Sequence, residues 1–240
     1  MKKTIIISSV ILSVALMASV LIYSNNLFKI QNLDNTLSTT GSATKVVDSD
    51  LAKLTSNFSR VVFEDKLKEG YTLMAQDEAK VVEFLKNNNI TEEEYILSPI
   101  RMYEEYNYNK SSYEEKQYNL TQEVIITSTD IEKVKSLSQK ANDLIKLDVI
   151  YQTNSPEYYY TKLPEERINL LPEAVKDAQK RAEAIAASTD RKVGTLKSAD
   201  MGVVQVMQPD STDISSYGTY DTSTVKKEIM ITVKANFVLK

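Results

Sequence analysis

The sequence predicts an α+β fold, a largely antiparallel sheet or sheets with helices packed on one face, preceded by one N-terminal transmembrane helix. Three observations support this prediction. Segments with the two-residue alternation of strands and segments with helical spacing follow one another in the order β-β-α-β-β-α-β-α-β-β. Strands often come in pairs rather than in strict alternation with helices, which favours antiparallel pairing. The first segment of the chain is uncharged and long enough to cross a bilayer.

The N-terminal segment predicts where the chain works. Lys2 and Lys3 precede an uncharged run over residues 4–23, and these 20 residues would span about 30 Å as a helix. Flanking positive charge stays on the cytoplasmic side, so the rest of the chain is expected outside the cytoplasm. We expect residues 1–23 to be an uncleaved signal anchor of a single-pass cell-membrane protein. If this segment is cleaved, the product would be secreted or periplasmic.

The exported part is expected to begin with a tether and a hairpin. Residues 24–33 are polar and form the tether, and residues 34–240 form one α+β domain. Residues 34–47 and 51–63 have strand character, and the Asp48-Ser49-Asp50 turn signal between them predicts an antiparallel hairpin. In the second strand one face is predicted to carry Ala52, Leu54, Ser56 and Phe58.

The middle of the chain predicts two helices and two strands. A helix over residues 68–88 is followed by a strand over 95–107, where Pro99 indicates a sheet edge. A strand over 116–129 leads to a helix that runs from Asp130 to about Lys146. Asp130 is a typical N-cap residue, which supports the start of that helix.

The last third of the chain predicts one long helix between strands. A strand over residues 148–160 precedes a helix over 164–188, which is followed by a strand over 191–207, a loop over 209–224 and a closing strand over 227–239. A narrow face of mostly small residues would let the helix lie close to a sheet: Leu170, Leu171, Ala174, Ala178, Ala182, Ile185 and Ala186.

Composition excludes several kinds of chemistry. The chain has no cysteine and no histidine, which excludes disulfides, thiolate nucleophiles, cysteine zinc sites and a Ser-His-Asp triad. Beyond residue 23 the chain keeps 27 of its 29 basic residues and all 33 acidic ones, a net charge of −6. This charge argues against nucleic acid and anionic lipid surfaces as partners of the exported part.

Three segments carry a resemblance to a known family. They are Thr40-Gly41-Ser42-Ala43 followed by Asp50-Leu51-Ala52, the run from Leu85 to Ile90, and the run from Ala174 to Ala186 with the following Arg191-Lys192-Val193-Gly194. Over residues 36–239 the chain resembles the SIMPL domain family of bacterial exported proteins, which includes a periplasmic immunogenic protein. The chain has Asn88 and Asp190 where the family often has glycine.

The resemblance implies fold and location more than mechanism. Some relatives look like ring-forming or channel-like oligomers of the periplasm, and others are linked to envelope or oxidative stress. The family has no agreed activity, and the shared motifs are structural. The resemblance therefore implies a homo-oligomer or an envelope-protein partner as an expectation, with no cofactor.

Tyrosines are the candidate interface residues. One group lies within a predicted strand and the loop that follows it, and the other is a run of three. Tyrosine is favoured at interfaces because it brings a large contact area at a small entropy cost, although it also favours strands for packing reasons alone. The predicted interface residues are Tyr103, Tyr106, Tyr108, Tyr113, Tyr158, Tyr159 and Tyr160.

Paired carboxylates are the other candidates for chemistry. The pairs at residues 92–94, 104–105 and 114–115 offer oxygen ligands, but they lack the spacing of a calcium loop. We expect them to be solvated, and we predict no catalytic, cofactor or metal site.

Two function classes follow from these observations. The first is a non-catalytic, membrane-anchored domain outside the cytoplasm that self-associates or binds envelope partners, with a link to envelope or oxidative stress. The alternative is a ligand- or metal-binding protein, or an enzyme that uses carboxylates and tyrosines. Convergence of several such side chains in one concave pocket would favour the alternative.

Overall fold

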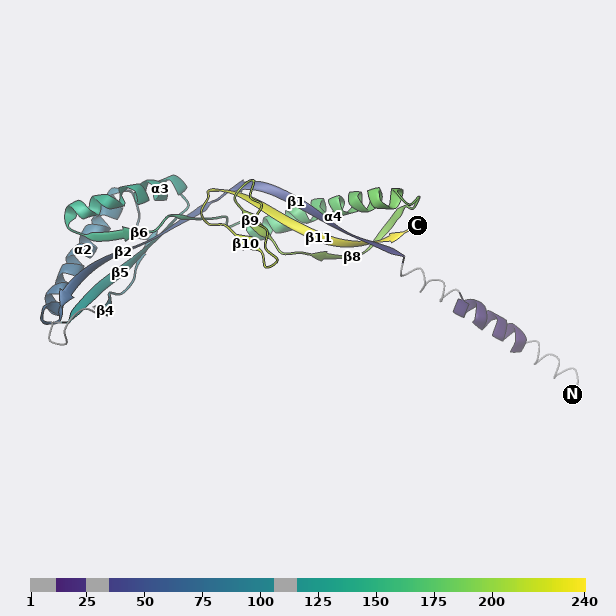
Figure 1. The fold of residues 1–240 in the computed structure, drawn as a ribbon, viewed down its shortest axis with the longest axis horizontal. Coiled ribbons are helices and arrows are strands. Elements are labelled where there is room, and N and C mark those ends of the chain that lie inside the picture. The colour runs from purple at the N-terminus through teal and green to yellow at the C-terminus, as the bar shows by residue number, and fades with distance from the viewer. Residues whose placement is uncertain (1–11, 25–34, 106–115) are drawn as a thin grey trace, which may run out of the picture. The chain divides into compact units, whose positions relative to one another are not determined.

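The computed structural model describes residues 12–24, 35–105 and 116–240 (Figure 1). The chain divides into two compact units. The first comprises Met1–Thr44, Arg167–Val204 and Met230–Lys240, and the second comprises Lys45–Glu166 and Gln205–Ile229. Strands β1 (Thr36–Asp48) and β11 (Lys226–Leu239) each contribute residues to both units, so neither unit is a continuous stretch of sequence.

The N-terminal helix covers part of the predicted anchor. Residues 12–24 are helical, and their large apolar side chains are exposed. Among the helices in the described ranges, none is both long enough and apolar enough to span a bilayer. Residues 1–11 of the predicted anchor and residues 25–34, which include most of the predicted tether, lie outside the described residues.

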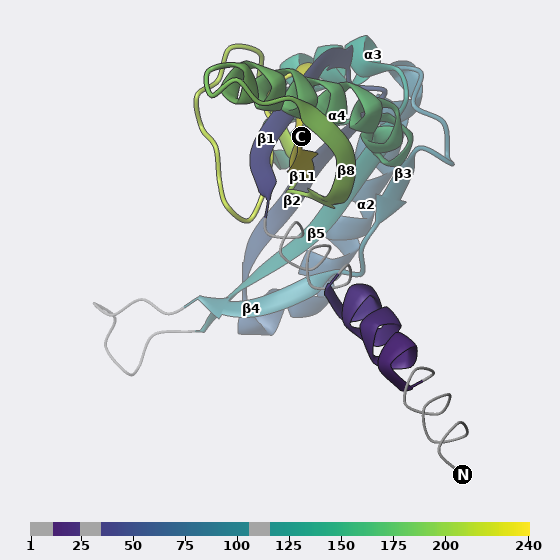
Figure 2. The ribbon, with the colours of Figure 1, turned by 90° about the vertical axis from the view of Figure 1, so that its right-hand side faces the viewer.

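In the first unit one long helix packs on a small sheet. Strand β11 neighbours β1 and also pairs antiparallel with β8 (Val193–Met201), with Val233 opposite Met201 and Ala235 opposite Ala199. Helix α4 (Leu163–Ala187) lies along this sheet (Figure 2). Ala178 and Ala182 form a buried cluster with Ala235 and Phe237, so the predicted small-residue face is the packing face.

Three residues of β1 hold helix α4 close to the strand. An ideal Cβ built on Gly41 would lie 2.2 Å from both the carbonyl oxygen of Ala174 and the backbone nitrogen of Ala178. Beside it the Thr39 hydroxyl donates a hydrogen bond to the Ala178 carbonyl at 2.8 Å. The Ser42 N–H donates to the Asp177 carboxylate at 2.9 Å. Glycine is required here because any side chain would occupy the space of the helix backbone.

In the second unit two helices cover one face of a larger sheet. Strand β2 (Leu51–Phe63) pairs antiparallel with β5 (Gln117–Ser128) over 12 residue pairs, from Ala52–Ser128 to Phe63–Gln117. The outer strands on one side are β3 (Tyr95–Leu97) and β4 (Arg101–Glu105), and those on the other are β6 (Ile150–Thr153) and β7 (Glu157–Tyr159). Helices α2 (Leu67–Asn87) and α3 (Ile131–Lys140) pack on β2 and β5 (Figure 1).

Hydrophobic burial explains this packing. The residues predicted to share one face of β2, Ala52, Leu54, Ser56 and Phe58, are all buried, which confirms the predicted alternation in this part of the strand. The apolar ones form one cluster with Met74 and Leu85 of α2 and with Val134 of α3. The Asp130 carboxylate caps α3 by accepting the Lys133 N–H at 2.9 Å, as the sequence predicts. A 3₁₀ helix, η3 (Ala141–Leu147), continues α3 and leads into β6.

The predicted hairpin between the first two strands is wrong. β1 and β2 belong to different sheets. The two linking residues bond elsewhere, because Ser49 N–H donates to the Val225 carbonyl and Asp50 N–H donates to the Tyr159 carbonyl. A two-residue hairpin loop needs positive φ angles, and neither residue has one. Ser49 and Asp50 therefore carry the chain from one sheet into the next.

The α+β class is confirmed, and several predicted strands are divided. The described order is β-β-α-β-β-β-α-β-β-α-β-β-β-β. Pro99 separates β3 from β4, Asn154–Pro156 separate β6 from β7, and Gly202–Val204 separate β8 from β9 (Gln205–Met207). The predicted loop over 209–224 contains the two-residue strand β10 (Thr219–Tyr220), which pairs parallel with β9, so the first sheet is mixed.

Candidate interaction surfaces

The predicted tyrosine interface is not one surface. Tyr158 is only 7% exposed and belongs to the core of the second unit. Burial raises the pKa of its phenol, the effect of an apolar environment on an acid. Tyr103 on β4 is 54% exposed. Tyr106, Tyr108 and Tyr113 lie outside the described residues.

Tyr159 and Tyr160 are partly covered by the chain itself. The Tyr159 and Tyr220 rings have their centroids 6.0 Å apart. The Tyr160 N–H donates to the Tyr220 hydroxyl at 2.8 Å, and the Tyr159 hydroxyl donates to Glu157 at 3.0 Å. The sequence prediction did not consider Tyr220, because it lies 60 residues away in a segment predicted to be a loop.

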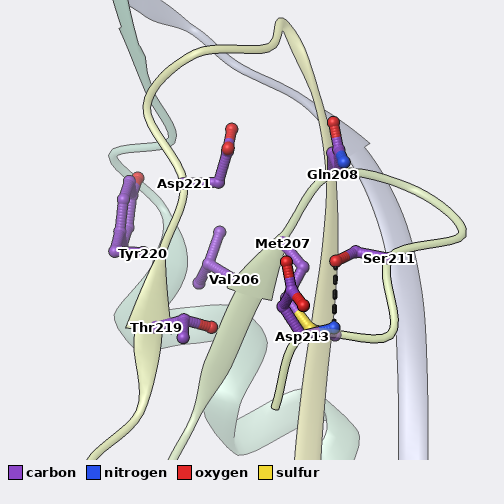
Figure 3. A pocket seen from close by; sticks show the side chains of 8 residues that line it. All are labelled: Val206, Met207, Gln208, Ser211, Asp213, Thr219, Tyr220 and Asp221. Carbon is purple, nitrogen blue, oxygen red and sulfur yellow. Dashed lines mark hydrogen bonds between the residues drawn. The ribbon is translucent and has the colours of Figure 1, made fainter. Parts of the chain in front are cut away.

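A pocket beside this segment collects two carboxylates and a tyrosine (Figure 3). It has a volume of about 240 Å³ and is lined from β9, from β10 and from the loop between them. Its carboxylates belong to Asp213 and Asp221, and Tyr220 also lines it. Within the described residues, no group of three or more acidic side chains is arranged to hold a metal ion.

Asp221 in this pocket is already engaged. Its carboxylate accepts hydrogen bonds from Ser223, Thr224 and the fully buried Lys227 ammonium, the last at 3.3 Å. Desolvation would raise the pKa of Asp221, but these hydrogen bonds outweigh it and lower the pKa. The pair joins Asp221, the residue after β10, to Lys227 of β11.

The predicted carboxylate clusters carry structural pairs. Glu94 bonds Lys133 at 2.6 Å and Ser128 at 2.5 Å, and it also accepts the Thr91 N–H. Desolvation would raise the pKa of Glu94, but these hydrogen bonds lower it to about 2. Glu92 pairs with Lys86 and Glu104 with Lys116, while residues 114 and 115 lie outside the described ranges. None of these described carboxylates faces another across a cleft.

The second unit has a groove between α2 and β6. Its volume is about 900 Å³, and it is lined by Arg60, Leu73, Gln76, Lys80, Ile145, Asp148, Val149, Ile150, Tyr151 and Gln152. Ile145 and Ile150 are 57% and 55% exposed, and Leu147 beside them is also exposed. We call Ile145, Leu147 and Ile150 the groove patch.

Ion pairs fix the polar rim of the groove. The Arg60 guanidinium bonds both oxygens of Asp77, which is buried, and donates to the Asp148 carbonyl at 3.0 Å. The hydrogen bond to Asp77 is the main cause that raises the pKa of Arg60. Lys80 donates to the Leu147 carbonyl at 2.7 Å. These bonds hold the turn at Asp148, where φ is 60°, and so set the groove patch in place.

Fold and surfaces together define a two-unit α+β protein with buried structural ion pairs and exposed apolar patches. The family described as SIMPL, a protein of unknown function (DUF541), matches residues 37–238. The chain therefore belongs to the SIMPL family, and the match extends over both units. A search of curated proteins found no match.

Proposed function

We propose that this chain is a non-catalytic domain, anchored in the membrane by residues 1–23 and located outside the cytoplasm, that self-associates through the groove patch. The observation that supports self-association is the anatomy of the groove. The exposed Ile145 and Ile150 line the groove together with Arg60 and Lys80, whose charged groups are already held by hydrogen bonds. Protein interfaces also combine apolar side chains with polar groups.

Mass measurement tests the self-association. Light scattering on residues 24–240 over a concentration series is expected to show an oligomer. Ile145→Glu would place a charge in the patch and shift the distribution to monomer, because an unpaired charge resists burial. Ile168→Glu is the matched control, since Ile168 is an exposed isoleucine outside the patch. A monomer at every concentration, or equal effects of the two variants, would refute the assembly.

The anchor has a separate test. The uncharged run over residues 4–23 behind two lysines supports a retained anchor. The intact mass of the protein extracted from membranes is expected to match a chain that begins at residue 1 or 2. A protease that reaches the outer side of an intact cell membrane is expected to digest the C-terminal part. A mature protein that begins near residue 24 and is released by osmotic shock would contradict retention.

Envelope partners and a stress role form the second part of this proposal. Membership of the SIMPL family, for which the sequence resemblance implies a link to envelope or oxidative stress, supports them. Crosslinking of intact cells followed by capture of the wild type and of Ile145→Glu would separate partners that need the groove patch from those that do not.

A further inference from the structure

The rings of Tyr159 and Tyr220 make a contact between two segments of the second unit that lie far apart in the sequence. Tyr159 is the last residue of β7, and Tyr220 is the last residue of β10. The ring centroids are 6.0 Å apart, and the ring planes are tilted by 31°. This separation lies within the range of direct aromatic contact, so carbon atoms at the edges of the two rings can meet.

Two hydrogen bonds hold the segments that carry these rings side by side. The Tyr158 N–H donates to the Thr222 carbonyl at 2.8 Å. The Tyr160 N–H donates to the Tyr220 hydroxyl, also at 2.8 Å. Groups that are held in one geometry react as if each were present at a very high concentration. The fold therefore favours a reaction between Tyr159 and Tyr220 over a reaction between two molecules.

Tyr159 has a proton acceptor at its hydroxyl group. The hydroxyl donates to the Glu157 carboxylate at 3.0 Å, a distance that allows direct proton transfer. Burial is the main cause that raises the pKa of Tyr159, and the neighbouring Glu157 adds to the effect, so the phenol is protonated near neutral pH. A phenol that loses one electron becomes strongly acidic. Its proton would then pass to Glu157 as the electron leaves.

The pair is open to solvent on the side of Tyr220. Tyr220 is 39% exposed, whereas Tyr159 is half-buried. An oxidant in solution can therefore reach Tyr220, and the ring contact gives it access to an electron from Tyr159. The chain has no cysteine, so a disulfide cannot join these two segments.

We propose that Tyr159 and Tyr220 are an oxidative cross-linking site that forms dityrosine. A one-electron oxidant, such as the oxidised haem of a peroxidase, removes one electron from each phenol. Glu157 accepts the proton of Tyr159, and water accepts the proton of Tyr220. The two phenoxyl radicals then join through a carbon–carbon bond between ring carbons that neighbour the hydroxyl-bearing carbons.

The hydrogen on each coupled carbon moves, through solvent, to the phenol oxygen of the same ring. The product therefore has two hydrogen atoms fewer than the reactants, and the oxidant takes up the two electrons. The cross-link closes a loop of about 60 residues, and a covalent link stabilises a fold mainly by restricting the unfolded chain. We expect the thermal transition of the cross-linked protein to rise by about 5 °C.

Peroxidase treatment of the full chain tests the proposal. The protein is kept dilute in a peroxide-free detergent, and a haem peroxidase with hydrogen peroxide supplies the one-electron oxidant. Trypsin then releases residues 147–162 and residues 198–226, which carry the two rings. The expected product is a covalent pair of these peptides whose mass lies two hydrogen atoms below their sum and which has the blue fluorescence of dityrosine.

Single substitutions identify the linked positions. Tyr159→Phe and Tyr220→Phe keep the ring but lack the phenol, and each is expected to abolish the linked pair of peptides. Tyr217→Phe is the matched control, because Tyr217 lies on the same tryptic peptide as Tyr220 and is 94% exposed. The control is expected to leave the yield unchanged. Glu157→Gln should slow the formation of the link about tenfold, because an amide is a poor proton acceptor.

The circular dichroism spectra of all variants should match the wild type, which separates loss of the reaction from loss of the fold. No linked peptides in the wild type, or linked peptides that persist in Tyr159→Phe or Tyr220→Phe, would overturn the proposal. Loss of the link in Tyr217→Phe would move the site to Tyr217 and overturn it as well. An unchanged rate in Glu157→Gln would disprove the proton transfer, and an unchanged thermal transition would disprove the stabilising effect.

Discussion

Single residues make two close contacts with testable consequences, and the first is at Gly41. Gly41→Ala would place a methyl group within 2.2 Å of the backbone of α4. Backbone atoms cannot move aside as a flexible side chain can, so we expect a loss of more than about 3 kcal/mol in the free energy of unfolding. Urea unfolding measures it. Gly218→Ala is an unsuitable control because φ is 87° there, whereas Ser59→Ala changes a partly exposed strand residue.

Glu94 makes the second contact and predicts a pH dependence. Its pKa in the folded state is about 2, below its usual value near 4.5. A lowered carboxyl pKa stabilises the fold above the unfolded-state value, and this stability is lost as the pH falls from about 4.5 through 2. Glu94→Gln should therefore cost about 2 kcal/mol at pH 7, after allowance for partial exposure, and much less at pH 2.5.

Denaturant unfolding of the wild type and of Glu94→Gln across this pH range checks the prediction. Glu92→Gln is the matched control, because Glu92 is largely exposed and its pair with Lys86 lies at the surface. A difference between wild type and Glu94→Gln that stays constant with pH would show that the Lys133 and Ser128 bonds do not lower the pKa.

At the scale of elements, the alanine face of α4 fixes how closely the helix lies on its sheet. Ala182 is buried against the cluster that contains Ala235 and Phe237, whereas Ala184 is exposed on the same helix. We expect Ala182→Leu to lower the free energy of unfolding by about 1–3 kcal/mol through overpacking, and Ala184→Leu to change it by less than about 0.5 kcal/mol. Equal effects in thermal unfolding would disprove close packing at Ala182.

Strand β8 shows how the first sheet limits pairing with other chains. Its register with β11 shifts twice, between Asn236 and Phe237 and again before Leu239, so it contains bulges near Lys197 and near Gly194. Bulges and lysine on an edge strand discourage the addition of a further strand. Strand β8 is therefore a poor template for the addition of a strand from another chain.

At the scale of the whole molecule, the sequence predicts elements better than their partners. Helical spacing and the Asp130 cap place α2, α3 and α4 within one or two residues at most ends, apart from the 3₁₀ continuation at Ala141. The predicted hairpin at Ser49–Asp50 was wrong because a turn signal in the sequence does not reveal which strands pair. Pairing between β1 and β11 joins residues about 200 positions apart, and no local pattern encodes it.

The candidate surfaces were less predictable for the same reason. The clustering of tyrosines named Tyr103 and Tyr158 alike as interface candidates, but it could not show that Tyr158 enters the core or that Tyr220 contacts Tyr159. The groove patch and the Tyr159–Tyr220 pair arise from residues on different strands and helices. No sequence motif marks these side chains, because only strand register and helix packing in the folded chain place them near one another.

The two ends of the described α+β part meet in the first unit. Leu239 N–H donates to the Asn35 carbonyl at 2.9 Å, and the Asn35 side chain donates back to the Leu239 carbonyl at 3.2 Å. A circular permutant that joins these ends through a short linker and opens at the exposed Asn154–Ser155 bond is expected to keep the wild-type circular dichroism spectrum. Loss of that spectrum would show that folding needs the original ends free.

The meeting of the ends also determines what a C-terminal label reports. In a chain held at its N-terminus, residues that follow Lys240 would emerge beside the start of β1, next to the tether. A fluorophore or an affinity tag attached there would lie beside the first residues of β1. A label within the exposed β6–β7 link would instead report on the second unit. A donor at one position and an acceptor at the other would therefore measure the distance between the two units by energy transfer.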